Sequence, residues 1–431
     1  ATAWPGESQA AKACNPHLPQ DRLINCLNNI LGESVARLQE AESSLAVAEA
    51  MLAENDQRID ALQAEVDAFA SVGALGDYLV VDTATDSVMF VGANVYVQSG
   101  SGSTDDDGQL LGLGNLVVGY DEGDPIDIKN GSHNLVVGKY HSYMSYGGLI
   151  AGEDHRVEGA ASSATGGESH WLTADYTSIT GGYDNHAGEV YASVTGGSDN
   201  DAAGAYSSIS GGYSGHATDD YASVSGGYDN EASGDYASVS GGMENAASGD
   251  YSTISGGQHN ETISHKTSIS GGEYNEARGT FSTITGGRGN DTMVSYGVVV
   301  GGWENTTEGE YAAVLGGAYN FATGERSCVS GGSSNRAEAD HSSVVAGLEN
   351  WAEGSFSSVS GGQNNHAQES YASVTGGSNN YATGESSSVT GGYNNGASGQ
   401  YSSISAGWEN TASGEAASVS GGGDNTADGW A

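Results

Sequence analysis

The chain contains little of what proteins use to bind polyanions, build disulfide frameworks or cross membranes. Its 431 residues include 3 Cys, 4 Pro and 12 Lys plus Arg, against 55 Asp plus Glu, so that the formal net charge is −43. This balance argues against nucleic acid or an anionic membrane surface as a partner. No stretch approaches the roughly 20 consecutive apolar residues of a membrane-spanning helix, so we expect no membrane insertion.

Sequence patterns of catalysis are also missing. The 11 His residues are scattered without the spacing of metal ligands, and most Ser and Asp residues belong to positions that recur throughout the chain. No phosphate-binding loop, nucleophile elbow or zinc pattern occurs. We therefore expect a protein that is not an enzyme.

Glycine is abundant, with 69 residues, and it is arranged in a repeat. From Gly166 to Gly421 the fifteen-letter unit G-G-x-x-N-x-A-x-G-x-Y-A-S-V-S recurs without insertion or deletion, and only Ala346 and Ala406 replace a first Gly. A fixed short period predicts a solenoid, in which each unit is one turn that stacks on its neighbours and cannot fold alone.

Equivalent positions of the repeat predict which side chains face the interior. One position is Ile or Val in seventeen successive units, Val224 and Val239 among them, and a small residue precedes it by two. Because alternate strand residues share a face, we expect both in a thin interior. An Asn position, with Asn230 and Asn245, is broken only by Gly215. We expect these amides to satisfy turn backbone groups and one another.

Two glycine positions predict the corners of each turn. The Gly-Gly pair and the Gly of N-x-A-x-G suit positive φ or close backbone approach. Each unit then holds two strands of about five residues and two tight corners. We therefore predict an all-β solenoid, a flattened parallel β-roll over 166–431 rather than a three-sided helix. Irregular early turns occupy 114–165, with 149–152 already in register with the later repeat.

The residues that flank the core Val or Ile predict a partner. They are Ser or Thr in most units but become apolar in a few. A solvent-exposed face does not usually change in this way, so we expect another chain to bury it. We expect Cys328 here to be a small buried residue rather than a reactive thiol. The apolar flanking residues, with this Cys, are Val298, Val300, Leu315, Cys328 and Val345.

A different period precedes the roll. Apolar residues recur at every seventh position, and a second set follows each of them by three, which predicts a coiled coil over 21–70. Asn55 falls in the second set, where a polar layer fixes register and strand number. Ala41 and Ala48 narrow the seam and leave dimer and trimer open from this segment alone. The first set is Ile24, Leu31, Leu38, Leu45, Leu52, Ile59 and Val66.

The start of the chain, residues 1–20, is not repetitive. Cys14 and Cys26 are twelve positions apart and could pair within one chain or between chains. The segment, with Trp4 and Pro5, is a candidate cover for the open end of the next rod, which would give head-to-tail filaments. In the alternative, Trp430 and the final Gly residues cover that end. The chain opens without Met or a signal peptide, which is typical of a secreted protein after cleavage.

Between coil and roll we expect a short β junction over 71–113, with strands at 77–82 and 87–91. Two acidic loops lie in and just beyond this junction. Clustered carboxylates can bind Ca²⁺ through oxygen ligands, although neither loop has the spacing of a named calcium motif. Calcium is the only cofactor that the sequence suggests. The candidate ligands are Asp105, Asp106, Asp107, Asp121, Asp124 and Asp127.

The N-x-A-x-G…S-x-V-x-G pattern resembles the head repeats of trimeric autotransporter adhesins. The resemblance implies left-handed parallel β-rolls packed as three chains and joined to coiled-coil stalks, although those repeats are usually one residue shorter. In the adhesins the head precedes the stalk, whereas here the coil precedes the roll. The stretch 92–138 is also similar to a group of uncharacterised bacterial proteins with a short coil, the same junction and S-V-S-G-G turns. Phage tail fibres carry such rolls too.

We therefore expect an extracellular or cell-surface structural fibre or adhesin, formed by a homotrimeric rod. A phage-tail-fibre-like receptor-binding protein and, further off, an ice- or surface-binding solenoid are the alternatives. A column of Tyr could be displayed to a cell-surface or glycan receptor, or could simply stack from turn to turn. Its members include Tyr191, Tyr206, Tyr221, Tyr236 and Tyr251.

Overall fold

The computed structural model describes residues 14–429, with the backbone alone at residues 70 and 71. The chain forms two compact units that divide between Tyr96 and Val97, inside the expected junction. The roles predicted for Trp4 and Trp430 concern residues outside the described part of the chain.

The first unit is a long helix followed by a hairpin. Helix α1 (Gln20–Gly73) has 54 residues, which corresponds to roughly 80 Å. It covers the segment with heptad periodicity, in which no Pro interrupts the backbone hydrogen bonds. A short 3₁₀ helix η2 (Ala74–Asp77) leads into β1 (Leu79–Asp82), which pairs antiparallel with β2 (Ser87–Phe90).

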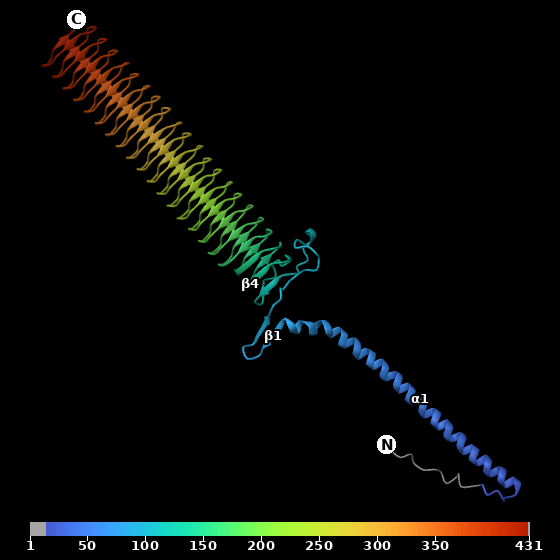
Figure 1. Cartoon of the computed structure of the whole chain (residues 1–431). Coiled ribbons are helices and arrows are strands. Elements are labelled where there is room, and N and C mark those ends of the chain that lie inside the picture. Colours follow the sequence, from blue (N-terminus) through green and yellow to red (C-terminus); the bar gives the residue numbers. More distant parts are fainter. Residues whose placement is uncertain (1–13, 430–431) are drawn as a thin grey trace. The chain divides into compact units, whose positions relative to one another are not determined.

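The second unit is a parallel β-solenoid of about 21 turns (Figure 1). After η3 (Asp106–Gly108), one ladder begins with β3 (Leu116–Val118), β4 (Leu135–Lys139), β6 (Leu149–Glu153) and β8 (Ser163–Ala164). Its even-numbered strands then follow once in every repeat, from β10 (Ser178–Ile179) to β42 (Ser418–Val419). At about 4.8 Å per strand the solenoid is roughly 100 Å long.

A second parallel ladder contains the odd-numbered strands from β5 onward. It begins with β5 (Ser142–Tyr143), β7 (Arg156–Val157) and β9 (Trp171–Leu172). From β11 (His186–Ala187) to β43 (Thr426–Ala427), successive strands are again one repeat apart. The predicted parallel β-solenoid, with turns of ~15 residues after an N-terminal helix, is thus confirmed.

The predicted strands of about five residues are wrong, because the regular strands have only two residues each. A third line of single parallel bridges, such as Tyr213 with Tyr228, runs between the two ladders. The backbone bends three times in each turn at residues with positive φ, for example Gly227 (97°), Asp229 (51°) and Tyr236 (58°). These bends interrupt the extended backbone before a longer strand can form.

Glycine is required at the two predicted corner positions for different physical reasons. At the second Gly of a pair, such as Gly227, φ is positive and a Cβ would overlap the backbone of the next turn. At Gly234 there is no positive φ, but a Cβ would again overlap the next turn. At the first Gly, such as Gly181, a Cβ would meet nothing within 4 Å. This explains why Ala346 and Ala406 are tolerated there.

The interior lies between the two ladders, as predicted. Val224 and Val239 of the first ladder are buried, and so is Ala232, which the second ladder contributes from the opposite side. The small residue two positions before each Val, such as Ala237, is buried as well. Each buried Val stabilises the fold by about 1.5–3 kcal/mol relative to an exposed one.

The early turns depart from the predicted register by a single position. Ile150 pairs with Ala164, so this turn is shorter by one residue than the regular repeat. Ile150 is therefore the buried residue, with 0% of its surface exposed, whereas Leu149 is 38% exposed. The preceding turn, from β4 to β6, is shorter by the same amount, because Leu135 pairs with Leu149.

Candidate functional site

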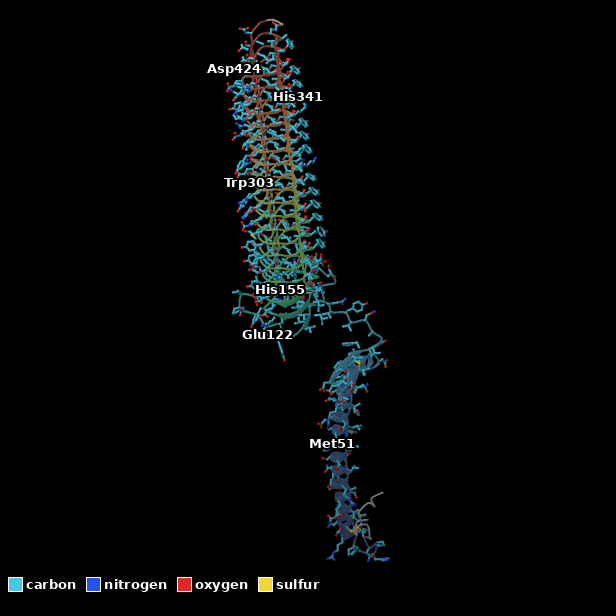
Figure 2. The ribbon with its side chains drawn as sticks, turned by 90° about the vertical axis from the view of Figure 1, so that its left-hand side faces the viewer. Met51, Glu122, His155, Trp303, His341 and Asp424 are labelled. Carbon is cyan, nitrogen blue, oxygen red and sulfur yellow. A yellow bond between two sulfur atoms is a disulfide. The ribbon has the colours of Figure 1, made fainter. Side chains whose placement is uncertain are left out.

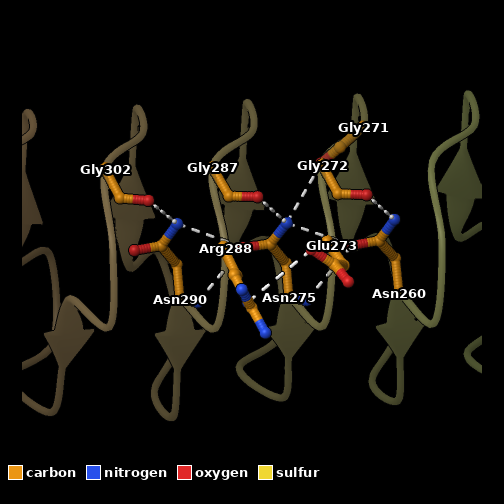
Figure 3. A network of polar contacts seen from close by, with 9 residues as sticks. All are labelled: Asn260, Gly271, Gly272, Glu273, Asn275, Gly287, Arg288, Asn290 and Gly302. Carbon is orange, nitrogen blue, oxygen red and sulfur yellow. Dashed lines mark hydrogen bonds and ion pairs between the residues drawn. The ribbon is translucent and has the colours of Figure 1, made fainter.

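The most regular polar feature of the solenoid is a ladder of buried asparagines. The backbone N–H of Asn275 donates to Oδ1 of Asn260 at 3.1 Å, and Oδ1 of Asn275 accepts from the backbone N–H of Asn290 at 3.1 Å (Figure 3). Nδ2 of Asn275 lies 3.1 Å from the carbonyl oxygen of Gly271 and 3.0 Å from that of Gly287. Asn245 has the equivalent contacts, and so has Asn230 except that its own backbone N–H faces Gly215, so each amide satisfies corner groups of two turns, as predicted.

The same ladder begins with three buried histidines, which the sequence analysis did not identify. The rings of His141 and His155 are 5.1 Å apart, and those of His155 and His170 are 4.8 Å apart and nearly parallel. Nδ1 of His155 accepts from the backbone N–H of His170, while Nε2 lies 3.1 Å from the carbonyl oxygen of Ala151. Nε2 must then carry the proton, so the ring is neutral. The G-x-x-H spacing that the three share, with His in the place of the later Asn, could have revealed them.

Burial and the neighbouring histidines lower the pKa of these rings. Burial is the larger cause at His155, followed by the charges that His170 and His141 would carry, and its pKa falls to about 3. Burial also lowers the pKa of His141 and of His170. The stack therefore holds three uncharged imidazoles at neutral pH.

The predicted Tyr column forms a continuous outer stack. Ring centroids of successive members are 4.9 Å apart from Tyr191 to Tyr206 and from Tyr206 to Tyr221, then 4.6 Å to Tyr236 and 4.9 Å to Tyr251. The rings are nearly parallel and about half exposed. The geometry is that of turn-to-turn stacking, and display to a receptor stays a prediction.

Rows of side chains run along both edges of the solenoid. Figure 2 shows them turn by turn, with Trp303 on one edge and His341 on the other. The Tyr column continues through Lys266, whose Nζ lies 5.7 Å from the Tyr251 ring and 5.2 Å from the Phe281 ring. Cations thus substitute for rings without interrupting the row.

The acidic residues of the first loop hold the loop rather than converge on one point. Asp106 is buried and accepts from the Ser99 hydroxyl at 2.5 Å and from the backbone N–H of Leu111 at 2.9 Å. Hydrogen bonds from Ser132 and Ser99 keep its pKa well below the ordinary value. Asp105 accepts from the Ser103 hydroxyl and from the backbone N–H of Asp107.

The second acidic loop has similar internal partners. Asp121 forms an ion pair with Lys129 at 2.8 Å and accepts from the Tyr143 hydroxyl at 3.0 Å. Asp127 accepts from the backbone N–H of Asp124 at 2.7 Å. Within residues 14–429, no three His, Cys, Asp or Glu side chains gather as a metal site would require. The structure therefore does not bring the candidate calcium ligands together.

The three cysteines form one disulfide and leave one free thiol. Cys14 and Cys26 form a disulfide within the chain, so that the segment before α1 is tied to its second turn. Cys328 is a free, partly buried thiol on the outer side of β30 (Cys328–Val329), among the flanking positions of the first ladder.

Two of the exposed apolar surfaces of the described chain belong to the helix and to the regular solenoid. The heptad residues of α1 are exposed, Leu52 to 63%, and the side chain of Asn55 is exposed beside them. On the outer side of the first ladder, Val300 is 45% and Leu315 is 48% exposed. These are the positions where the sequence predicts contact with another chain.

An unpredicted row of flat side chains lies on the outer side of the second ladder. Arg336 Cζ is 5.0 Å from the centre of the Phe321 ring and 5.3 Å from that of Trp351. His366 continues the row, 5.3 Å from Trp351, and Tyr381 lies 5.0 Å further on. The row borders a groove of about 540 Å³. In the sequence this position varies from one repeat to the next, and the sharing of flat groups by five consecutive turns was not predicted.

No protein-family model and no curated protein matches the chain. Within the described residues, no helix combines the length and the apolar character that crossing a membrane requires. The features that bear on function are therefore the repeated turns and the exposed apolar surfaces of the helix and of the first ladder.

Proposed function

We propose that the protein is a non-enzymatic extracellular fibre or adhesin, built as a rod of three parallel identical chains. The observation that carries this proposal is the exposed seam of α1. Leu31, Leu38 and Leu52 are each exposed by more than half in a helix with apolar residues at every heptad. In water such a helix gains most of its stability when partner helices bury the seam.

The solenoid supports the same assembly. Core Val and Ile already occupy the inner side of the first ladder, and Ser, Thr, Val and Leu form its outer side. A second copy that packs against Val300, Leu315 and Val345 would remove these exposed apolar groups from water. The chains would then be parallel along both the helix and the roll.

Three chains are favoured by several features together. Asn55 provides the polar layer that specifies strand number. The pattern of the roll resembles the heads of trimeric adhesins, whose repeats are usually one residue shorter than the regular repeat of this chain. The two early turns that precede Ala164 are shorter by that same single residue.

A location outside the cell fits the chemistry of the chain. The Cys14–Cys26 disulfide is of the kind that persists in oxidising compartments. A net charge of −43 favours solubility of a long, exposed rod. The rod would serve as scaffold and display surface, since its side chains repeat rather than converge on one reactive point.

Absolute mass in solution tests this proposal. Light scattering coupled to size exclusion should give three times the 43.6 kDa of one chain. Leu38→Asp places a charge in the seam and should weaken the assembly, whereas Gln39→Asp, one residue away and outside the seam, should not. A chain that is monomeric at micromolar concentration, with equal behaviour of both variants, would refute the trimer.

A further inference from the structure

The five flat side chains of the second ladder differ from an earlier stretch of the same ladder, in which acidic side chains predominate. The five strands of the second ladder from β29 (Phe321–Ala322) to β37 (Tyr381–Ala382), which carry odd numbers, each begin with a ring or a guanidinium that points outward. At the same position four of the five strands from 231 to 291 begin with a carboxylate: Glu231, Glu261, Glu276 and Asp291. Stacking of turns does not require this change, because both kinds of residue are accommodated in the same ladder.

The row forms one wall of the groove, and corner residues of the same turns form the other. Tyr319, Ser334, Glu349 and Asn364 lie on that second wall, one per turn. The groove thus crosses four successive turns and presents a flat group and a polar or hydroxyl-bearing group at each. A ligand in the groove would meet one flat group and one polar group about every 4.8 Å.

Several polar groups along the groove have no partner in the described chain. No described residue accepts a hydrogen bond from the indole N–H of Trp351 or from the terminal amino groups of Arg336. The Nε of Arg336 lies 3.4 Å from the carboxylate of Glu338. No described residue donates to the carboxylate of Glu349. These groups offer both donors and acceptors to a ligand.

The flat groups are held in place before any ligand arrives. Arg336 lies between two aromatic rings, and His366 is fixed by a hydrogen bond of 2.7 Å between Nδ1 and Oε1 of Glu353. A site whose side chains are already ordered loses little conformational entropy on binding.

We propose that this groove binds a neutral, linear saccharide that lies along the solenoid axis across these turns. Sugar rings combine C–H faces, which pack on aromatic groups, with hydroxyls that both donate and accept hydrogen bonds. The alternation of Trp351 and Arg336 with Glu349 and Asn364 matches that combination. A polymer of identical units also suits a groove whose lining repeats from turn to turn.

Charge and polarity argue against other occupants. Nucleic acid and acidic polysaccharides would be repelled by a chain of net charge −43. An apolar peptide segment would leave Arg336 and Glu349 desolvated without partners. A second copy of the chain would bring a further acidic surface toward Glu338 and Glu353, which border this row.

The inference rests on the proposed function in one respect, that the groove stays at the surface of the assembled rod. The trimer contact is assigned to the outer side of the first ladder, and the groove belongs to the outer side of the second. Because the two ladders face each other across the interior, the contact and the groove are on opposite sides of the solenoid.

Calorimetric titration of the full chain with cellohexaose, chitohexaose and maltohexaose tests the assignment. At least one of these neutral hexasaccharides should bind with a Kd below about 1 mM. Trp351→Ala should weaken that binding at least tenfold. Trp351→Phe, which keeps the stack but removes the indole N–H, and Glu349→Gln, which keeps the shape but removes the charge, should each weaken it severalfold.

Two matched variants control the experiment. Glu231→Ala alters the same strand position in an acidic turn, and Tyr236→Ala removes a stacked ring from the opposite edge. Both should leave saccharide affinity unchanged. The mass of every sample is measured in parallel, so a monomer that still binds the sugar would refute the trimer alone, and a trimer that binds none would refute the groove alone.

Three results would overturn the proposal. The first is absence of binding by all three hexasaccharides at millimolar concentration. The second is unchanged affinity in Trp351→Ala. The third is lateral association of rods, seen by light scattering, that Trp351→Ala abolishes, because the groove would then bind another copy of the chain.

Discussion

The imidazole of His155 lies 4.8 Å from that of His170 and nearly parallel to it, inside the solenoid. The contact is possible only while both rings are neutral, since Nδ1 of each ring accepts from a backbone N–H of the next turn. At the same position of later turns, Asn accepts the equivalent hydrogen bond. The buried ladder thus begins with groups that titrate and continues with groups that do not.

The first prediction is that acid destabilises the early turns. The pKa of His155 is about 3 in the folded chain, against an ordinary value of 6.5. Between these values the unfolded chain binds more protons, so stability is lost as pH falls. From pH 7 to pH 4 the loss is about 3 kcal/mol for this ring. Melting temperature measured against pH should fall less steeply in His155→Asn, and equal slopes would contradict the account.

The second prediction compares an interior residue with one on the outer edge. Val224→Asp places an unpaired charge in the interior and should cost more than about 3 kcal/mol. Tyr183→Ser changes a half-exposed side chain to the residue found one turn later, at Ser198, and should change stability by less than about 0.5 kcal/mol. Thermal unfolding followed by circular dichroism measures both. Similar losses in the two variants would mean that the faces are assigned wrongly.

The third prediction uses two adjacent glycines as a matched pair. Gly181→Ala should be tolerated or slightly stabilising, because a Cβ there meets nothing within 4 Å. Gly182→Ala should destabilise strongly, because φ is +100° and the Cβ would overlap Gly197 of the next turn. Denaturant unfolding of both variants tests this difference. If Gly182→Ala were as stable as Gly181→Ala, the turn geometry would be wrong.

The fourth prediction is that Gly215→Asn stabilises the solenoid. The Asn ladder is interrupted there, although the backbone N–H of Gly215 still donates to Oδ1 of Asn200 at 2.9 Å. A restored amide would serve two more corner carbonyls, for a gain of about 1–2 kcal/mol. The gain requires Oδ1 of Asn200, which lies 3.0 Å from the position of the new Cβ, to shift slightly. Gly396→Asn is the control, since its Cβ is in open space and only backbone entropy changes. A gain no larger than in the control would show that the ladder bonds contribute nothing.

Several features of the fold followed from the sequence alone. The constant repeat length predicted stacked turns, and the Val224 and Val239 position predicted the interior, because burial imposes the same residue type on every turn. The heptads predicted the helical segment for a similar reason, since one face must stay apolar along its whole length. The candidate partner surfaces could likewise be found, as exposed positions that nevertheless keep a restricted composition.

Other features depended on the tertiary structure. The alternation of apolar residues does not say how long each strand is, and the positive φ of Asp229 and Tyr236 limits the regular strands to two residues. Pairing of Cys14 with Cys26 was open from sequence, and the turn that precedes α1 brings their Cα atoms to 5.8 Å within one chain. The acidic loops suggested calcium, yet hydrogen bonds with Ser99 and Tyr143 turn their carboxylates toward the protein.

The groove is the clearest example of a feature that the sequence alone did not predict. Phe321, Arg336 and Trp351 follow one another at intervals of one full repeat, and in the sequence they occupy a position that otherwise varies freely. Only the parallel register places them in contact, since it aligns equivalent residues of successive turns at about 5 Å. The sequence by itself thus determined the repeat and its interior, because both arise from local periodicity. The tertiary structure decided which outward side chains act together, because that depends on the stacking of turns.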